Sequence, residues 1–99
     1  MTPQIEQKSQ ELGHALIRIA AYIRRRELGK RIEVLSYDLI GYIAAHNATK
    51  SINTAGALRG FVVLGKNILA IEPLNANILI EHLDLLIDGI RQSKGIRQL

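Results

Sequence analysis

The chain has 99 residues, a length that fits one domain able to bury a core without a metal ion or a disulfide. Hydrophobic residues make up 47% of it and aromatic residues only 4%, so we expect a core of aliphatic side chains. The absence of Cys excludes disulfide scaffolds, thiolate zinc sites and cysteine nucleophiles. The formal charge of +4 allows an acidic partner, of which nucleic acid is the commonest.

No segment predicts secretion or insertion into a membrane. Residues 1–11 are polar and contain acids, unlike a signal peptide. Residues 34–45 are mostly apolar, but Asp38 interrupts them and they are shorter than the roughly 18 to 20 residues that a membrane helix needs. We therefore expect a cytoplasmic protein that does not cross a membrane.

Thr2 and Pro3 predict the start of a first helix, because a Thr side chain caps free amides and proline suits the first helical position. Apolar residues then recur at steps of three, four and seven through about Leu28. They are Ile5, Leu12, Leu16, Ile19 and Ile23. Gly29 is the expected break. If the helix continued through Gly29, the first two helices would form one rod and a bundle would need a second copy.

A second helix is expected from Lys30 to His46, with a heptad-like apolar stripe. The stripe is Ile32, Leu35, Leu39, Tyr42 and His46. Residues 47–51 combine turn formers with Ser and Thr caps, which predicts a tight connection to a third helix over about 52–71. Pro73 ends that third helix, because the residue before a proline disfavours helical geometry.

The third helix carries two adjoining apolar stripes. One is Ala55, Leu58, Val62 and Leu69, and the other is Phe61, Leu64, Ile68 and Ile71. A fourth helix begins near Asn75 or Asn77, and its apolar residues cover most of its circumference. They leave an acidic strip of Glu81, Asp84 and Asp88. Such a helix is buried on more than one side.

Four helices joined by short turns predict an all-α, antiparallel up-and-down four-helix bundle over residues 1–99, a single domain. Residues 93–99 are expected to be a frayed basic tail. Because the third and fourth helices are more apolar than one small domain can hide, we also expect a homo-oligomer. Its interface is predicted at Ile78, Ile80, Leu83 and Ile87.

No motif predicts catalysis, a cofactor, a metal site or a small-molecule substrate. None of His14, His46 and His82 stands three or four positions from another His, or from a second set of ligands that would close a metal site, so structural roles are favoured for all three. The acidic strip is better explained as the solvated side of the fourth helix than as an acid–base pair.

Gly56 and Gly60 fall within helical periodicity, so their spacing predicts close approach of another helix and no phosphate loop. A small helical ribonuclease would need an Arg and a His, separated by four to six residues in the order Arg-x4–6-His, in a facing pair of helices, and the linear version of this motif is not present. We therefore expect no enzyme.

The strongest polar feature is a basic cluster that the bundle should place at one end. Five of the 13 Lys and Arg residues fall within eight positions, and another lies one heptad earlier. The candidate nucleic-acid-binding residues are Arg18, Arg24, Arg25, Arg26, Lys30 and Arg31. Sequence-independent phosphate binding needs only such a patch in a rigid position. A solvated corner paired with Glu27 and Glu33 explains the cluster equally well.

Aromatic side chains for base stacking are few. Tyr22, Tyr37 and Tyr42 are the only tyrosines, and Trp is absent. Sequence-specific recognition of single strands is therefore not expected. Contacts to the backbone of structured RNA fit this composition better.

At residues 27–32, Glu-Leu-Gly-Lys-Arg-Ile, followed by Leu39-Ile40 and Ile43-Ala44-Ala45, the chain resembles the small four-helix bundle proteins of the accessory variability determinant type. Those proteins accompany the reverse transcriptase of diversity-generating retroelements, and the four-helix proteins encoded in ribosomal RNA intervening sequences belong to the same superfamily. Leu28, Gly29, Arg31 and Ile32 match a Leu-Gly-x-Arg-Ile stretch, and Leu58-Arg59 matches the third helix. The chain lacks the usual proline between the first two helices, and Asp88-Gly89-Ile90 replaces a Gly-Gly-Trp.

The resemblance implies a non-enzymatic basic bundle, assembled as a pentameric ring, that binds a reverse transcriptase and structured RNA. The alternative from the residues alone is a protein-interaction module. In that case the apolar face of the fourth helix docks a partner helix and no nucleic acid is involved.

Overall fold

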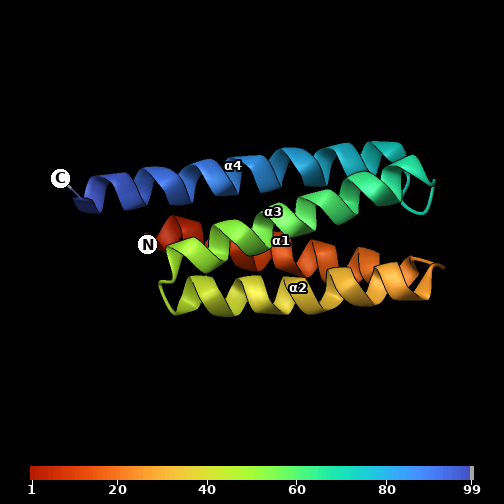
Figure 1. Cartoon of the computed structure of the whole chain (residues 1–99), viewed down its shortest axis with the longest axis horizontal. Helices are drawn as coiled ribbons and strands as arrows, with labels where there is room; N and C mark the ends of the chain where they lie inside the picture. Colours follow the sequence, from red (N-terminus) through yellow and green to blue (C-terminus); the bar gives the residue numbers. More distant parts are fainter. Residues whose placement is uncertain (99) are drawn as a thin grey trace.

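A computed structural model of the chain describes the backbone of residues 1–98 and the side chains of residues 1–93. It consists of four helices, α1 (Pro3–Tyr22), α2 (Arg26–Ala44), α3 (Ala48–Asn67) and α4 (Pro73–Gln98). The helices run alternately up and down, with the α1–α2 and α3–α4 turns at one end and the α2–α3 turn at the other (Figure 1). The predicted all-α, antiparallel up-and-down four-helix bundle is thus confirmed.

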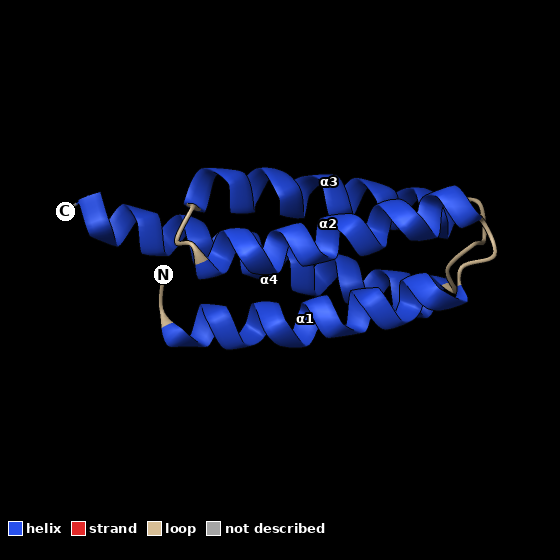
Figure 2. Cartoon of the chain, turned by 90° about the horizontal axis from the view of Figure 1, so that it is seen from below, coloured by secondary structure: helices blue, strands red, loops and turns tan. Residues whose placement is uncertain are grey.

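The bundle measures 45 × 20 × 18 Å along its principal axes, and its helices lie nearly parallel to the longest one (Figure 2). α1 packs on α2, α2 on α3 and α3 on α4, whereas the seam between α1 and α4 is the loosest. Within the described residues, none of the helices has an apolar stretch long enough to cross a bilayer.

α4 has 26 residues against 20 in α1, and its last turns extend past the α2–α3 turn (Figure 1). The tail expected to fray, residues 93–99, falls almost wholly on positions whose side chains lie outside the described residues. That expectation stays a prediction.

The break between the first two helices exists, but not at the expected place. α1 ends at Tyr22, the turn consists of Ile23–Arg25, and Gly29 lies buried inside α2. A β-carbon on Gly29 would stand 2.8 Å from the carbonyl oxygen of Ala20, so the glycine serves the close approach of α2 to α1. The alternative of one long rod is wrong, because α1 and α2 form an antiparallel hairpin.

Side-chain caps begin α1 and α3. The Thr2 hydroxyl accepts a hydrogen bond from the Ile5 amide at 3.2 Å, and the Asn47 side chain accepts one from the Lys50 amide at 3.0 Å. α4 begins at Pro73 itself, earlier than expected, because proline lacks only an amide that the first helical turn leaves free.

α2 and α3 end in the same way, with a non-glycine residue in the left-handed conformation. His46 and Leu69 each have φ of 58°. After α3, the Ala70 amide donates to the Gly65 carbonyl at 2.8 Å and the Leu69 amide to the Lys66 carbonyl at 3.1 Å, the hydrogen bonds of a Schellman cap. This cap ends α3 at Asn67, short of the expected end at Ile71.

Aliphatic side chains from all four helices form the core, as the composition predicts. The largest fully buried ones are Leu16, Ile32, Leu39, Ile43, Leu58, Val62, Leu83, Leu86 and Ile90. Ser9, Ser36 and Ser51 are also buried, and each donates its hydroxyl hydrogen to a backbone carbonyl oxygen three or four residues earlier in the chain. Small, satisfied side chains at these positions let the helices pack closely.

Two predicted stripes are shifted. In α2 the buried face passes through Ile43, while Tyr42 is half-buried and His46 lies exposed in the turn. Of the wide apolar arc expected in the third helix, Ala55, Leu58 and Val62 are buried within α3, and Ile71 is buried in the α3–α4 turn. Leu64 and Ile68 are exposed, because the arc is wider than the strip that α2 and α4 cover.

Candidate nucleic-acid interface

The six basic residues predicted to bind nucleic acid are all exposed, and all lie toward the end of the bundle that carries the α1–α2 and α3–α4 turns. We call this region the basic end, defined by Arg18, Arg24, Arg25, Arg26, Lys30 and Arg31. Lys66, in the last turn of α3, lies at the same end. It is far from the cluster along the chain, so the sequence does not predict this proximity.

Arg24 and Arg25 occupy the α1–α2 turn. They line a depression of about 370 Å³ whose other lining residues come from the end of α1 and from the α3–α4 turn. Those residues are Tyr22, Ile68, Leu69 and Ala70. Within the described residues, neither arginine has an ion-pair partner.

Arg26 is exposed at the first residue of α2, and three other basic residues line two further grooves at this end. Arg18 lines a shallow groove between α1 and α4 together with Tyr22 and Asn75. Lys30 and Arg31 line a groove of about 450 Å³ between α2 and α3, where the Arg31 Nε donates to Glu27 at 3.0 Å. The structure thus brings Arg18, Arg24 and Arg25 together around Tyr22, and it separates Lys30 and Arg31 from them.

Large apolar side chains are exposed at the basic end, where the sequence predicts only charge. Tyr22 is 85% exposed, Leu69 is 78% exposed and Leu74 is 64% exposed. The apolar spacing predicts that Leu69 lies in a stripe of the third helix, which is wrong, because α3 ends two residues earlier. No sequence signal reveals this exposure, since Leu69 continues the helical apolar spacing. Clustered exposed apolar groups mark contact surfaces.

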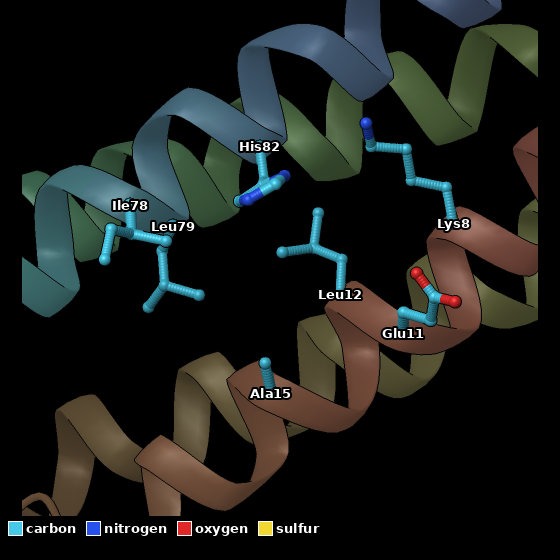
Figure 3. A pocket seen from close by; sticks show the side chains of 7 residues that line it. All are labelled: Lys8, Glu11, Leu12, Ala15, Ile78, Leu79 and His82. Atoms are coloured by element: carbon cyan, nitrogen blue, oxygen red, sulfur yellow. The ribbon is translucent and has the colours of Figure 1, made fainter.

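Farther from the basic end, a larger groove of about 360 Å³ follows the loose seam between α1 and α4, and we call it the α1–α4 groove (Figure 3). Leu12 and His82 point toward each other across it, and Ile78 lies on the α4 side (Figure 3). Lys8 and Glu11 provide the polar lining from α1. The groove is therefore an apolar channel with mixed charge along one edge.

The predicted oligomer interface needs a correction on this helix. Leu83 is 0% exposed and Ile87 is 9% exposed, so both belong to the core of the chain itself and neither offers a surface to a second copy. Ile78 is exposed and Ile80 is half-buried. Nine large hydrophobic side chains are exposed in the described part of the chain, and six of them lie between residues 64 and 85. The excess apolar surface is thus located as expected on α3, α4 and their turn.

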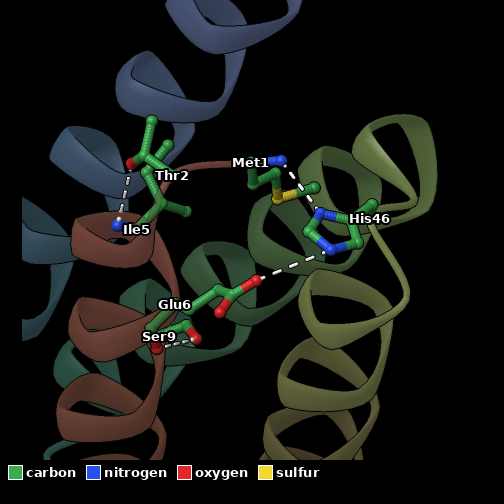
Figure 4. A network of polar contacts seen from close by, with 6 residues as sticks. All are labelled: Met1, Thr2, Ile5, Glu6, Ser9 and His46. Carbon is green, nitrogen blue, oxygen red and sulfur yellow. Dashed lines mark hydrogen bonds and ion pairs between the residues drawn. The ribbon is translucent and has the colours of Figure 1, made fainter.

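The histidines lie apart. His14 lines a shallow depression beside Tyr37, and His82 lines the α1–α4 groove. His46 contacts the start of α1, where its Nδ1 lies 2.9 Å from the Met1 ammonium and its Nε2 lies 3.7 Å from the Glu6 carboxylate (Figure 4). This contact joins the α2–α3 turn to α1. Across the described residues, no group of three His, Asp or Glu side chains is placed to hold a metal ion.

The acidic strip of α4 and the spaced glycines of α3 both lie on the surface of the bundle. Asp84 accepts a hydrogen bond from the Arg59 Nε at 2.7 Å, which ties α4 to α3, while Glu81 and Asp88 are exposed. Gly56 and Gly60 are exposed, and nothing lies within 4 Å of a β-carbon built on either. The expected close approach of another helix at these glycines is therefore absent from this bundle.

Comparison with protein-family models, with curated proteins and with solved structures finds no match to this chain. The resemblance to the accessory proteins of diversity-generating retroelements therefore remains a prediction.

Proposed function

We propose that the chain is a cytoplasmic, non-enzymatic, oligomeric accessory protein that binds structured nucleic acid through the basic end. From the resemblance stated above, the proposal includes a reverse-transcriptase-like partner. The observation that carries it is the position of Arg24 and Arg25, exposed on a short turn beside the α3–α4 turn and without an acidic partner in the described structure.

The α1–α2 turn supports this role because it holds its arginines in place. It contains only three residues, and one of them, Ile23, is buried in the core. Arginine presents a planar fork of donors that matches phosphate oxygens, and a rigid turn lowers the entropy lost on binding. Such an arrangement binds phosphates without reading bases.

The experiment compares two variants that lose the same charge. Arg24→Ala/Arg25→Ala removes two charges at the basic end, and Lys50→Ala/Arg91→Ala removes two at the opposite end. Binding to a labelled RNA hairpin is followed by anisotropy over a series of salt concentrations. Each lost phosphate contact lowers the steepness of log K against log salt by about 0.9.

We expect the basic-end variant to bind more weakly and to lose about two phosphate contacts from that slope. The control should keep the slope of the wild-type protein. Equal losses in both variants would show that net charge, and not this site, drives binding. A reverse-transcriptase gene next to the gene for this chain would support the partner part of the proposal.

The second candidate is a protein-interaction module with no nucleic-acid role. The α1–α4 groove favours it, since this seam is the loosest in the bundle and Ile78 is exposed there. A chain that sediments as a stable oligomer and ignores RNA at low salt would establish this candidate over the first.

A further inference from the structure

We infer that Tyr22, Arg24 and Arg25 form a binding site for an unpaired nucleotide, with the base stacked on the Tyr22 ring and the adjoining phosphates held by the two guanidinium groups. The inference rests on the proposed function of the basic end and specifies its ligand as a loop, a bulge or a strand end.

The exposure of Tyr22 is the first observation. This residue ends α1 and is 85% exposed, so its ring contributes little to the core. It lines both the depression that contains Arg24 and Arg25 and the groove that contains Arg18. An exposed aromatic ring with cationic side chains on two sides is the combination that binds single-stranded nucleic acids, because every base has a face that stacks.

The opposite wall of the depression is the second observation. Leu69 lies there with φ of 58°, a conformation that costs a non-glycine residue about 1 kcal/mol, and its side chain is exposed all the same. The Schellman cap that ends α3 sets this conformation and leaves the Leu69 side chain in solvent at the depression. Together with Ile68, Leu69 supplies an apolar wall against which a base packs.

Stacking also decides between paired and unpaired ligands. Inside a duplex, both faces of a base are covered by its neighbours, whereas an unpaired base in a loop, a bulge or a strand end offers a face to a tyrosine ring. The site lies at the end of a bundle 20 × 18 Å in cross-section. Arg18, on the other side of Tyr22, is placed for a neighbouring phosphate.

The test uses three RNA probes of equal phosphate number. One is a hairpin with an unpaired loop, the second is the same hairpin with abasic loop positions, and the third is a blunt duplex. The protein variants are Tyr22→Ala, Tyr22→Phe and, as a matched control, Tyr37→Ala, which removes another exposed tyrosine far along α2.

We expect Tyr22→Ala to weaken binding to the base-containing loop by roughly tenfold, as the loss of one stacked base does. Its affinities for the abasic loop and the duplex should not change, and its salt slope should stay that of the wild-type protein, because no phosphate contact is lost. Tyr22→Phe keeps the ring and should bind normally, as should Tyr37→Ala.

Fluorescence provides a direct readout of stacking. The chain has three tyrosines and no Trp. In a Tyr37→Phe/Tyr42→Phe variant, Tyr22 is therefore the one tyrosine left to emit. The base-containing loop should quench its emission, and the abasic loop should not.

The outcomes separate this inference from the proposed function. If Tyr22→Ala binds the loop as well as the wild-type protein while Arg24→Ala/Arg25→Ala binds it weakly, the stacking site is wrong and the phosphate-binding role stands. If the wild-type protein binds none of the RNAs, both are wrong. Binding to phosphatidylserine vesicles without binding to RNA would also overturn both, since arginines beside exposed Leu69 and Leu74 suit an anionic membrane surface as well.

Discussion

The carbonyl oxygen of Ala20 lies 2.8 Å from the position that a β-carbon on Gly29 would occupy. The two residues are buried at the end of the α1–α2 hairpin, next to the turn that carries Arg24 and Arg25. Gly29 therefore sets how closely α2 approaches α1 just below the basic end.

Gly29→Ala should lower the free energy of unfolding by about 1 to 3 kcal/mol, because a backbone oxygen cannot move aside as a side chain does. Urea unfolding followed by circular dichroism measures the change. Gly56→Ala is the control. Open space surrounds that helical position, so alanine there should raise stability by up to about 1 kcal/mol. Equal effects of the two substitutions would contradict the close contact.

Leu69→Gly should raise the free energy of unfolding by about 1 kcal/mol, because glycine adopts the left-handed conformation without strain. The lost side chain is 78% exposed, so little packing is removed. Thermal unfolding measures the gain. His46→Gly relieves the same backbone conformation but also removes the contacts with Met1 and Glu6, so its gain should be smaller.

Ile87→Asp and Ile78→Asp should behave differently, although both place a charge on α4. Ile87 is buried in the core, and an unpaired carboxylate there should unfold the chain at a cost of several kcal/mol. Ile78 is exposed, so its variant should keep the helical circular dichroism spectrum. Light scattering after gel filtration then tests the predicted oligomer. If Ile78→Asp keeps the mass of the wild-type assembly, Ile78 is not in the interface.

The ion pair between Arg59 and Asp84 should stabilise the bundle only slightly, by about 0.2 to 1 kcal/mol in a double-mutant cycle, because both side chains are nearly half exposed. Salt should weaken this coupling further. The Glu27–Arg31 pair within α2 is a comparison for the cycle. A coupling well above this range, or one that salt does not change, would show that the pair is shielded from solvent.

Local signals predicted much of the fold correctly. The Thr2 cap begins α1 as predicted. α3 begins at Ala48 after an Asn47 cap, earlier than the predicted start near residue 52 and without a Ser or Thr cap. Apolar spacing predicted the buried face around Leu12, Leu16 and Leu58. These signals depend on residues three or four positions apart, and a helix brings such residues together whatever surrounds it.

The candidate site was predicted only in part, for the same reason. The arginines are visible in the sequence because they are neighbours along the chain. Their relation to Leu69 is not, since that contact joins two turns more than forty positions apart. The exposure of Tyr22 was also missed, because it depends on where α1 ends.

The sequence by itself determined four amphipathic helices, their approximate order and a basic cluster between the first two, because propensity, capping and periodicity are local properties. Tertiary structure decided that Gly29 packs against Ala20 and does not end a helix. It decided that Leu83 and Ile87 are core residues, since the width of the strip covered by α1 and α3 cannot be read from one helix. It also placed the α3–α4 turn beside the arginines, because only the packing of the helices brings the two turns to one end.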